Sequence, residues 1–129
     1  MIGTWQVLFR LILAAILGGL VGLEREMQEK AAGFRTHILV CMGSCLMMLT
    51  SMHIFDLYKG VTSVDPARIA AQVVTGIGFL GAGTIIRYGA SVKGLTTAAS
   101  IWAICGIGLA VGCGFYTAAI FSALIILLS

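Results

Sequence analysis

The sequence predicts an all-α fold, a polytopic bundle of about five membrane-spanning helices joined by short loops and forming a single domain over residues 1–129. Hydrophobic residues make up 60% of the chain and charged residues only 10%, and the mean hydropathy is +1.07. Soluble proteins carry about 25% charged residues because a surface in water needs them. A chain surrounded by lipid presents apolar side chains in every direction, so this composition indicates a membrane protein.

Charged residues divide the chain into apolar segments of the length that crosses a membrane, about 20 residues at a rise of 1.5 Å each. Asp65 followed by Pro66 marks the start of the third segment, as a helix cap with proline at the first helical position. The uncharged stretch 95–129 is too long for one crossing, and it is expected to break at 112–114, where two glycines flank a cysteine. The expected helices are 5–23, 36–55, 67–86, 95–111 and 115–128.

Lysine and arginine are distributed unequally between the loops. The connections 24–35 and 87–94 hold Arg25, Lys30, Arg35, Arg87 and Lys93, whereas the opposite side holds Lys59 and Arg68. Because cytoplasmic loops carry the excess of these residues, we expect a bacterial plasma-membrane protein with its N-terminus outside and its C-terminus in the cytoplasm.

Arg10 lies inside the first apolar segment but near its start. An arginine side chain at that depth is long enough to reach the membrane interface, so we expect its guanidinium to lie there. Pairing inside the helix bundle is the alternative.

The remaining composition argues against several functional classes. The net charge is +3 and the basic residues are scattered, whereas nucleic-acid binding needs a concentrated Lys/Arg face. The four cysteines lie in apolar runs without CxxC spacing, so no metal site, cofactor or disulfide framework is predicted. No Ser/His/Asp or Cys/His arrangement is visible, and therefore no enzyme is predicted.

A stripe of soft side chains lies on one face of the second expected helix. It consists of Cys41, Cys45, Met48 and Met52, and His37 and His53 lie near the two ends of the same helix. Thiol and thioether groups in a row are typical of a copper site, but they also fill gaps in packed helix faces. Packing is the interpretation that we favour.

Glycine occurs seventeen times, often inside the expected helices. In lipid, glycine at four-residue spacing lets helix backbones approach closely, although the spacing leaves open whether the partner helix belongs to the same chain or to a second copy. The GxGxxG pattern at 76–81 also fits a dinucleotide-binding loop, but no acidic residue follows it, so packing is favoured. The expected helix-packing glycines are Gly18, Gly22, Gly76, Gly78, Gly81, Gly83, Gly108 and Gly112.

Polar side chains near membrane depth need a partner or water, and they are therefore candidates for function. We expect Glu24 and Glu26 either to anchor a helix end at the interface or to form a buried cluster with Arg35 and Arg87 on the same side. The spacing of Arg25 to Glu29 and of Glu26 to Lys30 favours a helix that continues past the membrane with surface ion pairs.

Four blocks of the sequence follow one another in a characteristic order. They are LGGLVGLERE at 17–26, GFRTH at 33–37, Asp65 with RIAAQVV at 68–74 and GIGFLGAGTIIR at 76–87, and VKGLTTAASIW at 92–102. In this order they strongly resemble the MgtC/SapB family. The resemblance implies a bacterial inner-membrane protein associated with growth at low magnesium and survival inside host cells, acting on other membrane proteins. Longer members add a soluble cytoplasmic C-terminal domain, which we expect to be absent here.

The resemblance also implies a set of polar positions whose chemistry is unassigned. These are Glu24, Arg25, Glu26, Arg35, Thr36, Asp65, Arg68, Gln72, Arg87, Lys93, Thr96 and Thr97. The leading hypothesis is a regulatory or stress-adaptation protein in which one group of these residues either organises the bundle or forms a polar site at the cytoplasmic end. This group consists of Glu24, Arg35, Arg68, Gln72 and Arg87. The alternative is a transporter or channel for a small ion such as Mg²⁺. The partners left open are membrane lipid, a second copy and other inner-membrane proteins.

Overall fold

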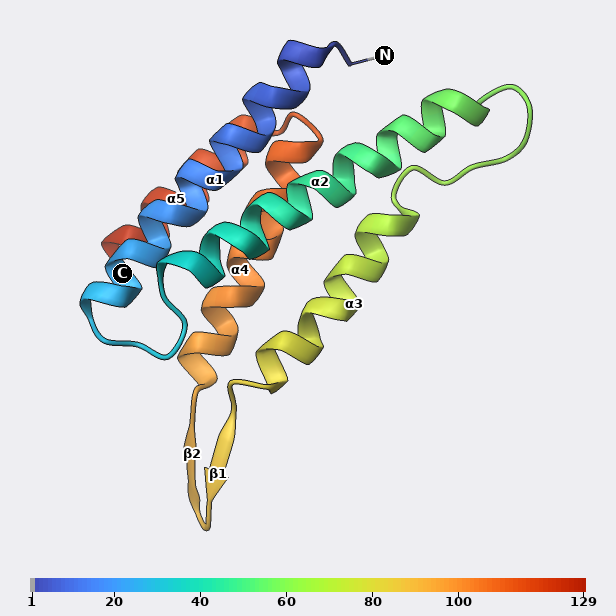
Figure 1. The fold of residues 1–129 in the computed structure, drawn as a ribbon. Coiled ribbons are helices and arrows are strands. Elements are labelled where there is room, and N and C mark those ends of the chain that lie inside the picture. Colours follow the sequence, from blue (N-terminus) through green and yellow to red (C-terminus); the bar gives the residue numbers. More distant parts are fainter. Residues whose placement is uncertain (1) are drawn as a thin grey trace.

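The computed structural model describes residues 2–129, which form five helices and one short hairpin (Figure 1). The helices are α1 (Thr4–Met27), α2 (Phe34–Tyr58), α3 (Arg68–Ala82), α4 (Leu95–Gly112) and α5 (Tyr116–Leu128). Strands β1 (Ile86–Tyr88) and β2 (Ser91–Lys93) pair antiparallel between α3 and α4.

The predicted all-α membrane bundle is confirmed. Helices α1, α2 and α4 are long and apolar enough to cross a membrane, whereas α3 and α5 are shorter apolar helices. At 1.5 Å per residue, α3 spans about 22 Å and α5 about 20 Å. The break expected at 112–114 is present, with Gly114 in the left-handed region at φ +85°. The two termini lie at opposite ends of the bundle (Figure 1).

The third helix differs from the prediction of 67–86. Asp65 accepts a hydrogen bond from the Ala67 amide at 2.9 Å, and the helix begins one residue later than expected. It ends at Ala82, where the Thr84 hydroxyl donates to the Gly81 carbonyl at 2.7 Å. The chain then enters the hairpin, because Gly89 at φ +59° makes a two-residue turn that favours paired strands.

Helix α2 is the centre of the fold, because α1 packs on one side of it and α4 on another. A Cβ added to Gly18 would lie 2.6 Å from the His37 carbonyl oxygen of α2, and one added to Gly22 would lie 2.8 Å from the Gly33 carbonyl oxygen. The glycine pair on α4 faces α2 in the same way. A Cβ added to Gly112 would lie 2.8 Å from the carbonyl oxygen of Cys45. Both GxxxG pairs therefore pack helices of one chain together.

The glycines of α3 have different surroundings. A Cβ at Gly76 or Gly78 would meet nothing within 4 Å, and at Gly81 it would make an ordinary contact with Ala98 at 3.6 Å. At Gly83 the nearest atom is the Leu80 carbonyl oxygen of the same chain, at 3.4 Å. Helix α3 thus packs against α4 through Gly81, whereas Gly76 and Gly78 lie on two other sides of the helix, both of them open.

Candidate functional site

A buried polar contact joins α1 to α4. Arg25 lies in the last turn of α1 and is only 8% exposed. Its Nη2 donates to Oγ1 of the buried Thr97 at 2.9 Å, and its Nε is buried without a hydrogen-bond partner among the residues described. No carboxylate in residues 2–129 lies within ion-pair distance of this guanidinium. Arg25 lies in the last turn of α1, where the negative end of the helix dipole favours a cation.

His37 makes a second polar contact, between α2 and α4. Its Nδ1 lies 2.8 Å from the Gly33 carbonyl oxygen, which can only accept, so Nδ1 carries the proton and donates. In the neutral imidazole Nε2 then accepts from the Ser100 hydroxyl, whose oxygen lies 2.6 Å away. His37 is completely buried. We call Arg25, His37, Thr97 and Ser100 the polar cluster.

The polar cluster is built by two local features of the sequence. Gly18 and Gly22 bring α1 close enough to α2 for His37 to be enclosed. On α4, Thr97 and Ser100 are three residues apart and therefore project on the same side of the helix. Sequence reasoning missed Ser100 and considered His37 only beside the Cys/Met stripe of the second helix, although the spacing of the two hydroxyl residues indicated a polar face on α4.

The other predicted site residues are not brought together. Glu24 is half-buried, and Glu26, Arg35, Thr36 and Thr96 are exposed. The ion pair formed within residues 2–129 is Lys59 with Asp56 at 3.5 Å, at the opposite end of the bundle. Because α1 ends at Met27 and Glu29 takes a positive φ of 58°, the expected helical pairs with Arg25 and Lys30 do not form.

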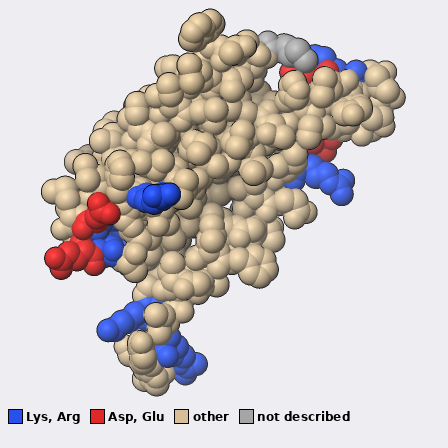
Figure 2. Space-filling view, in the orientation of Figure 1, with Lys and Arg blue, Asp and Glu red and all other residues tan. Residues whose placement is uncertain are grey.

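Three further residues of the predicted cluster lie on other elements. Arg68 begins α3, at the end of the bundle away from the polar cluster, and Gln72 is exposed on the same helix. Arg87 lies on the hairpin, where its Nε donates to the Gly89 carbonyl at 2.9 Å. The charged side chains gather at the two ends of the molecule, with a broad uncharged surface between them (Figure 2).

Arg10 pairs inside the bundle, which was the alternative to reaching the interface. Its Nε donates to the Tyr116 hydroxyl at 2.9 Å, and its Nη1 donates to the Gly112 carbonyl at 2.8 Å. The guanidinium also lies 5.8 Å from the centre of the Tyr116 ring. Gly112 is the last residue of α4, and its carbonyl receives no backbone hydrogen bond from the α4–α5 turn, so it is free to accept from Arg10.

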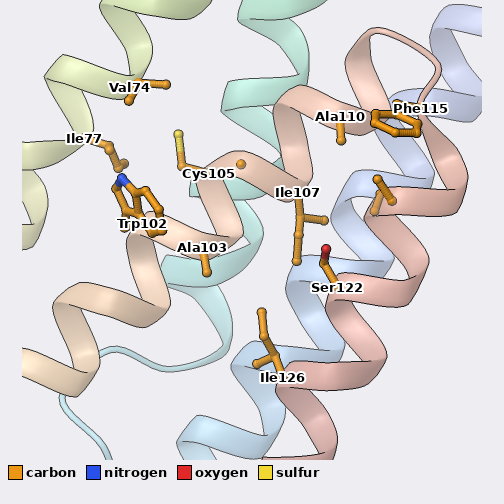
Figure 3. Close-up of a pocket in the computed structure, with 13 residues that line it drawn as sticks. Val74, Ile77, Trp102, Ala103, Cys105, Ile107, Ala110, Phe115, Ser122 and Ile126 are labelled. Atoms are coloured by element: carbon orange, nitrogen blue, oxygen red, sulfur yellow. The ribbon is translucent and has the colours of Figure 1, made fainter.

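An apolar pocket of about 440 Å³ lies between α3, α4 and α5 (Figure 3). Ile77 and Trp102 line one side, and Ser122 and Ile126 line the other. Its lining is almost entirely hydrocarbon, so it suits an apolar chain and offers little to a polar ligand. Within residues 2–129 no group of three or more His, Cys, Asp or Glu side chains is placed to hold a metal ion.

The polar cluster predicts different effects for two adjacent threonines. Thr97→Val keeps the side-chain shape but removes the acceptor of the Arg25 hydrogen bond, and we expect it to lower the free energy of unfolding by about 1.5–3 kcal/mol. Thr96→Val, on the exposed neighbour, should change it little. Unfolding of both variants by SDS titration in mixed micelles, followed by circular dichroism, measures the difference. Equal effects would contradict the assigned role of Thr97.

These features define the class of the protein. Three helices of membrane-spanning length, charges at both ends and a buried polar contact between helices make it a polytopic membrane protein. The sequence profile of the MgtC family matches residues 11–129, and the chain belongs to this family. The resemblance of the four sequence blocks is thereby confirmed.

Several curated relatives match almost the whole chain. It is 48% identical over 127 residues to "Putative magnesium transporter YhiD" of Escherichia coli K12, and the aligned region covers 97% of this chain and 59% of that protein. It is 46% identical over 121 residues to Protein MgtC of Salmonella typhimurium, covering 93% and 49%. It is 42% identical over 128 residues to Protein SapB of Bacillus subtilis, covering 96% and 55%. The chain spans about half the length of these relatives. No solved structure matches it.

Proposed function

We propose that this chain is a membrane-embedded regulatory protein. It supports bacterial adaptation to low magnesium, and it is linked to virulence or to the stress response. It acts by contacting other proteins of the inner membrane, and the polar cluster holds α1, α2 and α4 in the arrangement that those partners meet. The alternative is transport of a small ion such as Mg²⁺.

The position of the charges carries this proposal. The charged side chains that reach into the bundle are Arg10 and Arg25, both hydrogen-bonded to other helices or turns. All carboxylates lie at the helix ends or in loops: Glu24, Glu26, Glu29, Asp56 and Asp65. Mg²⁺ prefers carboxylate and other oxygen ligands, and it is repelled by a guanidinium. A path for Mg²⁺ through one copy would therefore carry the wrong charge.

Close packing also supports regulation over conduction. A Cβ added to Gly18 would lie 2.6 Å from the backbone of α2, so even a methyl group does not fit between these helices. An ion moving between α1 and α2 would require their separation. Contact with a partner requires no such rearrangement, because the outer faces of α3 and α5 are exposed.

One observation favours transport as the second candidate. The outer face of α3 carries Gln72, Thr75 and Gly76, all exposed. Small and polar residues on a membrane helix are typical of helix contacts and of ion pathways. If several copies assembled with these faces inward, α3 would line a central path, in agreement with the name of the E. coli relative.

The orientation proposed for the protein follows from its basic residues. The α1–α2 connection and the hairpin lie at the same end of the bundle (Figure 1). Together with the helix turns next to the connection, which hold Arg25 and Arg35, they contain five of the eight Lys and Arg residues. This end is proposed to face the cytoplasm, where short loops carry the excess of positive charge. The C-terminus is then cytoplasmic and the N-terminus lies outside.

A flux measurement distinguishes the two candidates. The purified protein is reconstituted into liposomes that contain a Mg²⁺-sensitive dye, and folding is shown by circular dichroism of the same vesicles. We expect no uptake above that of empty vesicles. Uptake that rises with the amount of protein would overturn the regulatory proposal and establish transport.

A second experiment tests regulation directly. A strain that lacks the protein is grown at low Mg²⁺ with and without the chain supplied in trans, and proteins cross-linked to the chain in native membranes are identified. We expect restored growth and a membrane protein among the cross-linked products. Restored growth with cross-links only to lipid and to the chain itself would contradict action through a partner protein.

A further inference from the structure

The hairpin formed by β1 and β2 has no covering element in the part of the chain that the structure describes. The two strands pair with each other through three residues each, and no helix packs extensively against either strand. A two-stranded hairpin alone is marginally stable in water, and it normally needs a third strand or a helix against one face. It projects beyond the last turn of α3 and the first turn of α4 (Figure 1).

The exposed side chains of the hairpin are apolar or cationic. Ile86 is 49% exposed, Tyr88 63% and Val92 45%. Arg87 and Lys93 are exposed as well, and no acidic residue occurs between 66 and 129. Figure 2 shows the blue atoms of basic residues at this projection without red atoms beside them. The hairpin thus offers positive charge next to exposed hydrocarbon.

The pairing register places these side chains on two faces. Ile86 pairs with Lys93 and Tyr88 with Ser91, so these four lie on one face of the hairpin. This face combines an aliphatic, an aromatic and a cationic side chain. Tyrosine and lysine are the residues that favour the headgroup layer of a membrane, where the ring or stem is apolar and the tip is polar.

The base of the hairpin is held firmly by the bundle. Gly94 is the residue before α4 and has a left-handed φ of 91°, and a Cβ there would collide with the Thr84 carbonyl group. The Thr84 hydroxyl lies 3.4 Å from the Gly94 carbonyl oxygen and closes the two ends of the hairpin together. The direction in which the hairpin leaves α3 and α4 is therefore fixed by backbone packing.

We propose that the hairpin lies in the headgroup layer of the membrane and binds anionic phospholipid. Ile86 and Tyr88 enter the boundary between headgroups and acyl chains, and Lys93 and Arg87 contact lipid phosphates. Charge complementarity identifies the partner, because two cations without a neighbouring anion meet a surface that carries negative charge. The hairpin projects beyond the first turn of α4, a helix long enough to cross a membrane, so lipid headgroups are the nearest such surface.

Hydrogen exchange measured by mass spectrometry tests the proposal on the full chain. The protein is reconstituted in vesicles of phosphatidylcholine alone, or of equal parts phosphatidylcholine and phosphatidylglycerol. Exchange of the amides in residues 84–95 should be slower in the anionic vesicles, by roughly fivefold for each cation that contacts them. High salt should reduce the difference by screening. Equal exchange in both vesicles would overturn the proposal and leave an acidic protein segment as the partner to test.

Two double variants distinguish an effect of the hairpin cations from an effect of the total positive charge at this end of the bundle. Arg87→Gln with Lys93→Gln should abolish the lipid-dependent difference, while the helical circular dichroism stays unchanged. Lys30→Gln with Arg35→Gln removes the same charge from the α1–α2 side of the same end, and it should preserve the difference at 84–95. Loss of the difference in this control would overturn the role of the hairpin. Inorganic phosphate added to neutral vesicles should not reproduce the protection, and protection by phosphate alone would overturn the requirement for lipid.

Discussion

Gly108→Leu should prevent the protein from folding stably, with a loss of at least about 3 kcal/mol in the free energy of unfolding. A Cβ at position 108 would overlap the Ser44 hydroxyl and the carbonyl oxygen of Cys41 on the central helix α2. Backbone atoms cannot move aside as the end of a flexible side chain can, so α4 would have to separate from α2. The measurement is the midpoint of unfolding by SDS in mixed micelles, together with the yield of folded protein.

A matched control for Gly108 is Gly106, another glycine of α4, with alanine as the substitution at both positions. At Gly106 an added Cβ meets nothing within 4 Å, whereas at Gly108 it collides with α2. Gly106→Ala should therefore be neutral or slightly stabilising, because alanine favours a helix over glycine by up to about 1 kcal/mol. Gly108→Ala should be destabilising. Similar behaviour of the two alanine variants would contradict the helix contact.

The second large effect is expected at Arg10. Arg10→Ala removes hydrogen bonds from a charged group to the Tyr116 hydroxyl and the Gly112 carbonyl, and it should cost about 3 kcal/mol in the free energy of unfolding. The loss should be local at first, since these bonds hold the α4–α5 turn against α1. Hydrogen exchange of α5 should therefore accelerate more than that of α2.

Two controls accompany the Arg10 variant. Arg68→Ala removes an exposed arginine at the start of α3, and it should change stability little. Tyr116→Phe removes only the hydroxyl, and its effect should be smaller than that of Arg10→Ala. In the double variant of Arg10 and Tyr116 the two effects should not add, because both residues belong to one contact. Full additivity would show that the contact contributes nothing to stability.

The candidate site was only partly predictable from the sequence. Arg25 and Thr97 were both named, and the structure joins them at 2.9 Å. Glu24 and Glu26 were expected as partners for arginines on the same side, but sidedness places residues at one end of a bundle without specifying which helices touch. Which groups meet depends on the rotation of each helix about its axis. That rotation is set here by glycine contacts such as Gly18 against the backbone at His37.

The third helix shows a different limit, namely that hydropathy does not predict where a helix ends. The apolar run through Ile86 satisfied the length rule for a membrane helix, so hydropathy alone extended the helix into β1. The signal that would have corrected it is local, namely β-branched residues followed by a Gly-Ala pair at 89–90. Turn geometry decides between helix and hairpin where hydropathy does not distinguish them.

The amino-acid sequence by itself determined that the chain belongs in lipid, where its five helices lie to within about four residues at each end, and which loops share a side. These properties follow from composition and spacing, because the free energy of transfer into a membrane depends on each segment separately. The tertiary structure alone decided that both GxxxG pairs face α2 of the same chain, that Arg10 closes the α4–α5 turn, and that His37 meets Ser100. Each of these is a contact between residues far apart in the chain, and it exists only once the helices have packed.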